Sequence, residues 1–327
     1  YFYHLISLQR YRYPSNSYIS LMKNTFKGTS KSYLSLFFIT LAVVLILKVI
    51  FNFLALGVIN QIWNFDALEV FYDLENKIFN LIYVHKILAL FDQVGTFLIP
   101  SIVIFFLFKS IKPTYSKIEK IDYLKLFYSF IVLIGITQLL AYISMSIGYD
   151  FLPESIKSYL KSQQDFNTTL QEKFIGESLL SFTYNILLLT IIPAIGEELF
   201  FRGLIQKIFI GIFKKTSNPV LYGIVTTSII FGILHFQIEN LLAIIFASVF
   251  FGYIYEKSKN ITLTIILHFC FNLFALVNMQ AIKIGLVSEN TIEFLGNYII
   301  TPIAVLIALI MIKKKIFWKE KSLLSID

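Results

Sequence analysis

The sequence predicts an all-α, polytopic membrane protein with about eight transmembrane helices. Of the 327 residues, 57% are hydrophobic and only 15% are charged, whereas a soluble domain is about 25% charged. The charged residues stand between long apolar segments, so the excess apolar surface must face lipid. Helices satisfy their own backbone hydrogen bonds in lipid, and the sequence shows no period of two that a membrane barrel requires.

A helix that crosses a hydrocarbon core about 30 Å thick needs roughly 20 residues. The first expected segment is long and has no evident cleavage site, so it is expected to be retained as a span. The fifth and sixth are unusually short, at about 15 to 17 residues or roughly 25 Å. The expected segments are Tyr33–Leu56, Leu88–Phe108, Leu124–Ile147, Leu179–Leu204, Val220–Phe236, Leu241–Tyr255, Ile261–Asn278 and Ile299–Ile312.

Charges in the connecting segments alternate along the chain. Residues 1–32 are basic without an acid, the first and third loops are rich in Asp and Glu, and the second and fourth loops and the tail from Lys313 are basic. The positive-inside rule then places both termini in the cytoplasm of a multi-pass protein of the cell (inner) membrane. Because the basic residues do not form one stripe, we expect the lipid bilayer and not nucleic acid as the partner.

The simplest division is one membrane domain with four parts. These are a basic cytoplasmic segment at 1–32, N-terminal helices and loops at 33–178, a catalytic core at 179–278, and the last helix with a basic tail at 279–327. Met22, followed by a basic stretch and an apolar segment, has the pattern of a start, so residues 1–21 are expected to be upstream sequence. The single cysteine, Cys270, cannot form an internal disulfide.

Ionisable side chains within apolar segments are informative, because each costs at least about 2.5–3.5 kcal/mol at the bilayer centre unless it is paired or hydrated. The fourth segment contains Glu197, Glu198 and Arg202. Glu198 and Arg202 are four residues apart and share a helical face, so we expect them to pair, while Glu197 points about 100° away. The structural alternative is an ion pair at a helix end near the surface.

Two further pairs share a helical face by their spacing. Phe231 and His235 lie in the fifth segment, which places the aromatic ring beside the imidazole, and His268 and Asn272 lie in the seventh. Taken alone, a histidine at a helix end is more often an interfacial residue, and a His–Asn pair can simply form an interhelical hydrogen bond. Together with the fourth segment they form a polar cluster that packing does not require.

These groups suit the hydrolysis of an amide bond. An unpaired glutamate in a low-dielectric site can take a proton from water, and we expect this role for Glu197, with His235 sharing the proton or orienting the water. His268 and Asn272 can donate hydrogen bonds to the oxygen that becomes negative when water adds to a carbonyl.

The same residues resemble a known family. Glu-Glu-x-x-x-Arg, Phe-x-x-x-His and His-x-x-x-Asn, ending at Arg202, His235 and Asn272, are similar to the three motifs of the CPBP (Abi) family of intramembrane proteases, which includes CAAX prenyl endopeptidases and bacteriocin-processing or immunity proteins. The resemblance covers roughly Leu179 to Asn278. It implies an eight-helix endopeptidase in which Glu197 and His235 activate water. The bilayer setting suggests a membrane-bound or lipidated peptide substrate, the prenylated CAAX type among them.

Whether a metal takes part is a separate question. Members of this family are often described as metalloproteases, and Glu197, His235 and His268 could supply two imidazoles and a carboxylate to zinc. The sequence lacks His-Glu-x-x-His, which places two ligands on one helix. We therefore favour a glutamate mechanism without a cofactor and retain a zinc-dependent hydrolase as the alternative.

One geometric difficulty and two alternative functions remain. Simple counting places Glu197 and His235 at different depths, although the short fifth segment and a kink at Pro193 would bring them within the reach of one bridging water. A non-catalytic immunity or interaction protein would use the cluster only to hold its helices together. A proton-coupled transporter also buries acids and histidines, but it predicts paired inverted segments that the sequence does not show.

Overall fold

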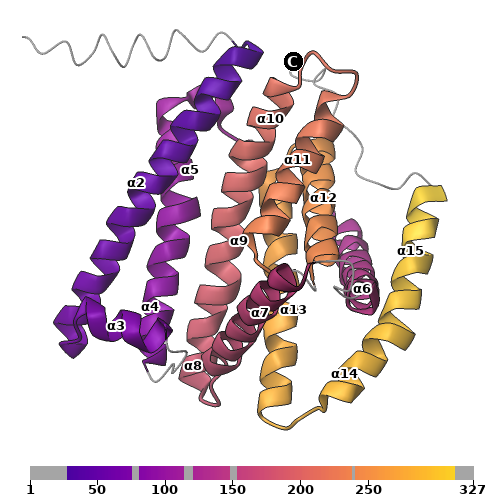
Figure 1. Cartoon of the computed structure of the whole chain (residues 1–327). Coiled ribbons are helices and arrows are strands. Elements are labelled where there is room, and N and C mark those ends of the chain that lie inside the picture. The colour runs from indigo at the N-terminus through magenta and orange to yellow at the C-terminus, as the bar shows by residue number, and fades with distance from the viewer. Residues whose placement is uncertain (1–27, 76–80, 114–120, 148–152, 238–239, 314–327) are drawn as a thin grey trace, which may run out of the picture.

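The computed structural model describes residues 28–75, 81–113, 121–147, 153–237 and 240–313, and within these ranges it contains helices and turns but no strand. Residues 1–27, which include the expected start at Met22, and most of the basic tail lie outside the described ranges. Figure 1 shows a bundle of long helices running between two ends of the molecule. The expectation of an all-α, multi-pass membrane protein is confirmed.

Seven helical segments in the described ranges are long and apolar enough to cross a membrane. Three of them are interrupted by π-helical turns, which shift the side chains that follow by part of a turn and often lie near functional sites. The seven are α2 (Ser30–Trp63), α4 (Ile82–Gln93) with η1 (Val94–Leu98) and α5 (Ile99–Leu107), α6 (Tyr123–Ile147), α8 (Leu179–Asn185) through η4 (Ile186–Ile191), α9 (Ile192–Glu197) and η5 (Glu198–Ile205) to α10 (Gln206–Ile212), α12 (Leu241–Ser258), α13 (Ile261–Lys283), and α14 (Glu289–Leu295) with η6 (Gly296–Ile300) and α15 (Thr301–Lys313).

The expected fifth span forms a short helix, as its length in the sequence predicts. It forms α11 (Pro219–Leu234), an apolar helix of 16 residues, which is about 24 Å long and short for a hydrocarbon core of about 30 Å. Asn218 caps its start by accepting a hydrogen bond from the amide of Leu221 at 3.2 Å. It ends because Phe236 adopts a left-handed conformation with φ of 50°, through which an α-helix cannot continue. The described part of the chain therefore has seven helical segments long enough to span a membrane and one shorter apolar helix.

Helices also form where the sequence suggested only loops. These are α3 (Ala67–Glu75), the 21-residue α7 (Glu154–Phe174), and the short α14. In α7, Phe166, Leu170 and Phe174 recur every four residues, which is the period of one helical face. Figure 1 shows α7 lying obliquely across the bundle beside α8 and α13, toward the end that carries α3 and α14.

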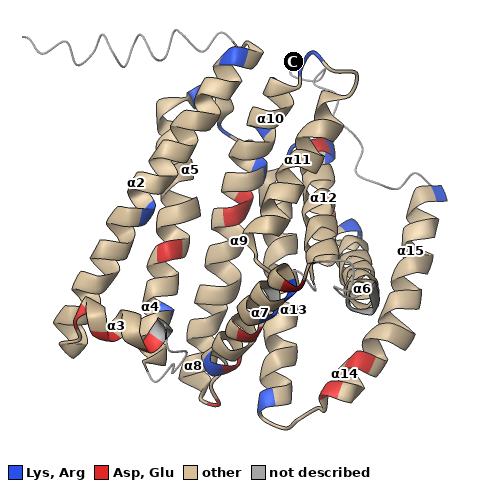
Figure 2. Cartoon of the chain, viewed as in Figure 1, with Lys and Arg blue, Asp and Glu red and all other residues tan. Residues whose placement is uncertain are grey.

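Charge is distributed unequally between the two ends of the bundle. Figure 2 shows mainly Lys and Arg at the end where α2 begins and α10 finishes, and most of the Asp and Glu at the opposite end around α3, α7 and α14. Lys31 near the start of α2 and Lys313 at the end of α15 belong to the first end, and Glu289 at the start of α14 belongs to the second. This asymmetry is the pattern on which the positive-inside rule depends.

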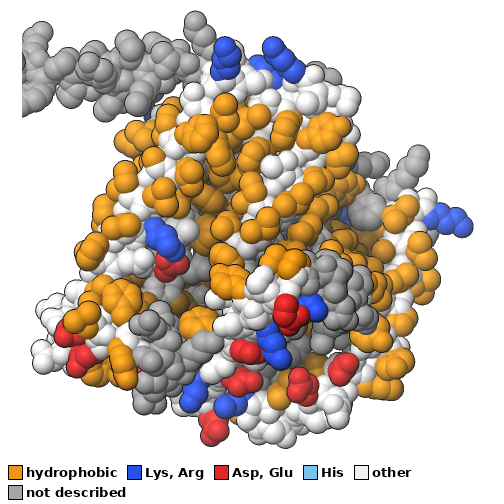
Figure 3. All heavy atoms as spheres, viewed as in Figure 1, with side chains coloured by type: hydrophobic (Ala, Val, Ile, Leu, Met, Phe, Trp, Pro, Cys, Tyr) orange, Lys and Arg blue, Asp and Glu red, His pale blue; other side chains and the backbone are white. Residues whose placement is uncertain are grey.

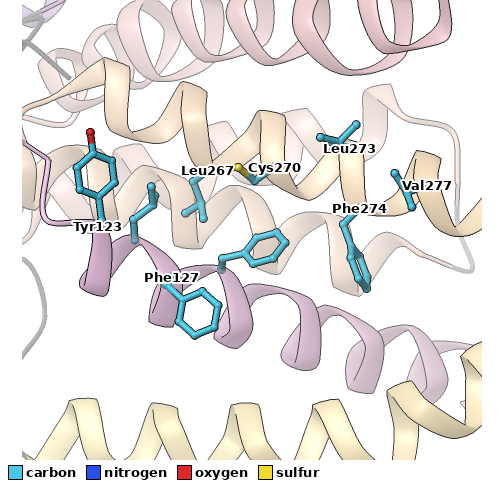
Figure 4. A pocket seen from close by; sticks show the side chains of 9 residues that line it. Tyr123, Phe127, Leu267, Cys270, Leu273, Phe274 and Val277 are labelled. Atoms are coloured by element: carbon cyan, nitrogen blue, oxygen red, sulfur yellow. The ribbon is translucent and has the colours of Figure 1, made fainter. Parts of the chain in front are cut away.

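The outer surface between these ends is apolar, as Figure 3 shows for one face. Phe53 and Phe106 keep 70% and 74% of their surface exposed, which is favourable only where lipid replaces water. A shallow apolar groove of about 440 Å³ lies between α6 and α13 (Figure 4). Cys270 lines it, on a different face of α13 from His268 and Asn272, as its spacing predicts.

Candidate active site

Glu198 and Arg202 form a fully buried ion pair inside the bundle. Oε1 of Glu198 lies 2.8 Å from Nη1 of Arg202, and both side chains are 0% exposed. The pair confirms the contact predicted from their spacing of four residues. A buried charge pair is stable only when its remaining donors and acceptors also find partners, so the groups around it are informative.

Arg202 holds neighbouring helices together. Its Nη2 donates to the carbonyl of Ser248 at 3.3 Å and to Oγ of Ser248 at 3.1 Å, both on α12. The guanidinium carbon lies 4.8 Å from the ring centre of Phe231 on α11 and 5.1 Å from that of Phe251 on α12. Stacking between two aromatic rings suits a planar guanidinium and not a lysine ammonium.

Glu198 also binds a histidine from α13. Nδ1 of His268 donates to Oε1 of Glu198 at 2.9 Å, because a carboxylate paired with arginine can only accept. The proton on Nδ1 directs Nε2 of His268 toward Glu197, whose Oε2 lies 4.0 Å away. The ring of Phe251 stacks on His268 at 5.1 Å and 19°, which fixes the orientation of the imidazole.

Glu197 differs from Glu198 in its surroundings. It is 7% exposed, and no lysine or arginine in the described residues forms an ion pair with it under 4 Å. Its side chain lines a chamber of about 400 Å³. The prediction that Glu198 pairs with Arg202 while Glu197 points elsewhere agrees with this arrangement.

His235 is positioned by the end of α11. Its Nδ1 donates to the carbonyl of Phe231 at 2.7 Å, which leaves Nε2 as the acceptor. The rings of Phe231 and His235 have centres 4.4 Å apart, as their spacing predicts. His235 and Glu197 line the same chamber, and a single water bridging the two side chains stays a prediction.

Two chambers meet at the polar residues. The chamber with Glu197 is covered by α7 and also lined by His235, His268 and Asn272. A second chamber of about 470 Å³ lies toward α6 and α14, and the same two histidines and Asn272 line it as well. These three side chains therefore separate a carboxylate-bearing chamber on one side from a mainly apolar chamber on the other.

The residues proposed as zinc ligands share this chamber but do not form a metal-binding group. Among the described residues, no three His, Cys, Asp or Glu side chains lie close enough together to hold an ion. The histidines themselves have the orientation that ligands need, because each donates from Nδ1 and leaves Nε2 free. Zinc binding at Glu197, His235 and His268 would therefore require the side chains to move.

Some residues around the site were not identified from the sequence. Ser248 and Phe251 contact Arg202 and His268 from α12, and Gln93, Asn167 and Gln171 line the chamber from α4 and α7. Ser248 and Gln93 are polar residues within apolar helices, which is a detectable signal. The amphipathic period of α7 is another.

Comparison with known protein families supports the motif-based resemblance. Residues 179–274 match the family described as Type II CAAX prenyl endopeptidase Rce1-like, and this range contains all three motifs. The match covers less than a third of the chain and leaves α2 to α7 outside it. Searches of curated proteins and of solved structures found no significant match.

Proposed function

We propose that this multi-pass membrane protein is an intramembrane endopeptidase that hydrolyses a peptide bond of a membrane-associated substrate through water activated by Glu197 and His235. The substrate is a membrane-bound or lipid-modified peptide, with prenylated CAAX peptides as the first class to test. Both termini face the cytoplasm of the cell membrane in this proposal, as the charge asymmetry of the two ends favours.

One observation carries the proposal. Glu197, His235, His268 and Asn272 come from three separate helical segments and line one chamber, while the charge of Glu198 is taken up by Arg202 and His268. Because Glu198 is already occupied, Glu197 is the carboxylate available to a water molecule. A cluster that only joined helices would satisfy its polar groups with one another and would not line a cavity.

The hydrolysis follows from these positions. Glu197, assisted by Nε2 of His235, takes a proton from water as the water oxygen bonds to the carbonyl carbon of the substrate. The carbonyl oxygen becomes an oxyanion and accepts hydrogen bonds from Asn272 and His268. The carbon–nitrogen bond then breaks, and the proton moves to the departing amine, which leaves a carboxylate and an amine.

His268 must be doubly protonated to act as a donor from Nε2, because Nδ1 already donates to Glu198. Glu197 and Glu198 contact opposite nitrogens of the ring, at 4.0 Å and 2.9 Å. Nε2 of His268 thus lies where it can bind either the carboxylate of Glu197 or the developing oxyanion. The proposed role of His268 depends on this shared position.

The proposed mechanism uses no metal, and a zinc-dependent hydrolase is the alternative. Zinc would polarise the carbonyl and lower the pKa of bound water. The protein is purified, reconstituted in vesicles and treated with a strong zinc chelator. Retention of activity, with no stoichiometric zinc by elemental analysis, supports the glutamate mechanism, and recovery of lost activity on addition of zinc contradicts it.

The function itself is tested with a prenylated CAAX peptide and its unmodified control in the same vesicles. Glu197→Gln is expected to lower the rate of cleavage at least about 100-fold, while the protein keeps its thermal unfolding midpoint. A protein that uses the cluster only for packing would lose stability with the substitution. Cleavage by Glu197→Gln at the wild-type rate would eliminate the mechanism.

A further inference from the structure

The chamber beneath α7 has an unusual set of polar groups. Among its described lining residues Glu197 is the only carboxylate, and no lysine or arginine takes part. Its other polar side chains, apart from the two histidines, are carboxamides. They are Gln93 of α4, Asn167 and Gln171 of α7, Gln237 after α11, and Asn272 of α13. A carboxamide both donates and accepts hydrogen bonds without charge, so this lining matches the donors and acceptors of a peptide backbone.

Gln93 has a buried hydrogen-bond acceptor without a partner in the described part of the chain. Its Oε1 is buried and has no partner among the residues that the structure describes. Buried acceptors without a partner are rare and costly in native proteins, and each calls for an explanation. The last side-chain torsion of glutamine is broad, so rotation can turn this amide toward the chamber that its side chain lines.

Gln93 also has a structural reason to face this chamber. The π-helical turn η1 begins at the next residue, Val94, and farther along it Phe97 lies 3.4 Å from the position of a β-carbon built on Gly196. This contact shows that η1 packs against α9. Gln93 precedes Phe97 by about one helical turn. It lines the chamber together with Pro193 and Glu197 of α9.

Helix α7 is held over the chamber by its own carboxamides. Nδ2 of Asn167 donates to the carbonyl of Phe236 at 3.3 Å, directly after His235, and Nε2 of Gln171 lies 3.5 Å from the sulfur of Met279. Asn167 and Gln171 are one helical turn apart and therefore share the face of α7 that covers the chamber. The first bond is longer than a typical N–H···O bond, and the second goes to a thioether sulfur, which is a weak acceptor, so both can be exchanged for a ligand at low cost.

We propose that Gln93, together with Asn167 and Gln171 of α7, forms a binding subsite for an extended, uncharged peptide segment on the side of Glu197 that faces α7. This inference rests on the proposed peptidase function for the identity of the ligand. The subsite comes from α4 and α7, outside residues 179–274, and it places the peptide backbone in the polar chamber. The apolar anchor of the same peptide then extends into the chamber lined by α6 and α14.

Binding is measured directly, without cleavage, in the Glu197→Gln background reconstituted in nanodiscs. The probe is a fluorescent synthetic peptide with an apolar anchor of about 20 residues followed by a segment of Gly, Ser and Asn. Adding Gln93→Leu or Gln171→Leu is expected to weaken binding about three- to tenfold, the effect of one lost hydrogen bond. In the protein with Glu197 intact, Gln93→Leu is expected to raise KM by a similar factor and to change kcat by less than about twofold.

Two control variants match these substitutions. Gln280→Leu removes another glutamine whose buried Oε1 has no partner among the described residues, but Gln280 does not line the chamber. Gln163→Leu removes a glutamine of α7 that also does not line it. Neither is expected to change probe affinity. Gln93→Asn shortens the side chain but keeps the amide, so it is expected to recover part of the affinity lost in Gln93→Leu.

The outcomes separate this inference from the proposed function. Binding that depends on Gln93 and Gln171, without any cleavage by the wild-type protein, supports the subsite and contradicts the peptidase. Cleavage with the same KM in wild type, Gln93→Leu and Gln171→Leu overturns the subsite and leaves the peptidase intact. Absence of probe binding to the Glu197→Gln protein, or equal loss of affinity in Gln280→Leu, also overturns it.

Discussion

Nδ1 of His268 lies 2.9 Å from Oε1 of Glu198, the same oxygen that contacts Nη1 of Arg202 at 2.8 Å. One carboxylate oxygen thus contacts both a histidine of α13 and an arginine of η5. The contact gives Glu198 a positioning role for His268 in addition to its role as the partner of a buried cation.

Glu198→Gln tests this relationship. The substitution leaves Arg202 buried without a counter-ion, and breaking a buried pair costs about 3–5 kcal/mol. We therefore expect a lower free energy of unfolding together with slower cleavage, because the neutral amide oxygen of glutamine holds Nδ1 of His268 more weakly than a carboxylate does. Thermal unfolding in detergent and cleavage at a temperature where the variant is folded measure the two effects. The matched control is Glu256→Gln. Glu256 is on α12 and pairs with Lys259, the residue that follows this helix. This substitution is expected to leave cleavage unchanged.

His235→Ala is compared with His85→Ala. His235 lines the chamber, so its loss is expected to slow cleavage about 100- to 10,000-fold with little change in stability. His85 is a buried histidine, only 4% exposed, and it contacts Asp73 at 2.7 Å in the packing of α3 and α4. His85→Ala should therefore lower the unfolding midpoint and leave the folded fraction active. Equal loss of activity in both variants, measured per folded molecule, would remove the special role of His235.

Sequence spacing predicted contacts within one helix more successfully than contacts between helices. The pair of Glu198 and Arg202 and the ring contact of Phe231 and His235 follow from a separation of four residues, because such residues share a helical face. Ser248 could not be assigned to Arg202 in this way, since it lies on another helix. Helix packing determines that contact, and spacing along the chain carries no information about it.

The same distinction explains the errors in the fold. Hydrophobic length located the spanning segments, but it could not show that α11 ends at Leu234. That end is set by the left-handed turn at Phe236, whose carbonyl accepts a hydrogen bond from Asn167. The partner comes from α7, a helix whose polar composition made it look like a loop. A hydropathy profile identifies helices that contact lipid. It does not identify a polar helix such as α7, which covers a polar chamber.

Gly135→Ala is expected to destabilise the packing of α6 against α15. A β-carbon at Gly135 would lie 2.2 Å from Cβ of Ala304 and 3.0 Å from the carbonyl oxygen of Ile300, and backbone atoms cannot yield easily. We expect a loss of about 1–3 kcal/mol from this overpacking, measured by thermal unfolding. Gly57→Ala serves as the control, since a β-carbon there meets nothing within 4 Å. It should be neutral or slightly stabilising, because alanine favours the helix.

Lys48 and Asp92 form an ion pair between α2 and α4, with side chains 42% and 38% exposed on the apolar exterior. Lys48→Leu leaves Asp92 facing lipid alone, which costs up to about 3 kcal/mol, and Asp92→Leu does the same to Lys48. The double variant replaces both charges and is expected to recover most of the lost stability. Additive losses in the double variant would show that the two side chains do not interact.

The length of α11 has a consequence for where in the bilayer a bond is cut. His235 follows the last turn of this helix, so the number of residues between Pro219 and Leu234 fixes the distance of the imidazole from the membrane boundary at which α11 starts. Each added helical turn would move the ring by about 5.4 Å. Related chains with a longer or shorter helix at this position would then select different cleavage positions along an embedded peptide while keeping the same reacting groups.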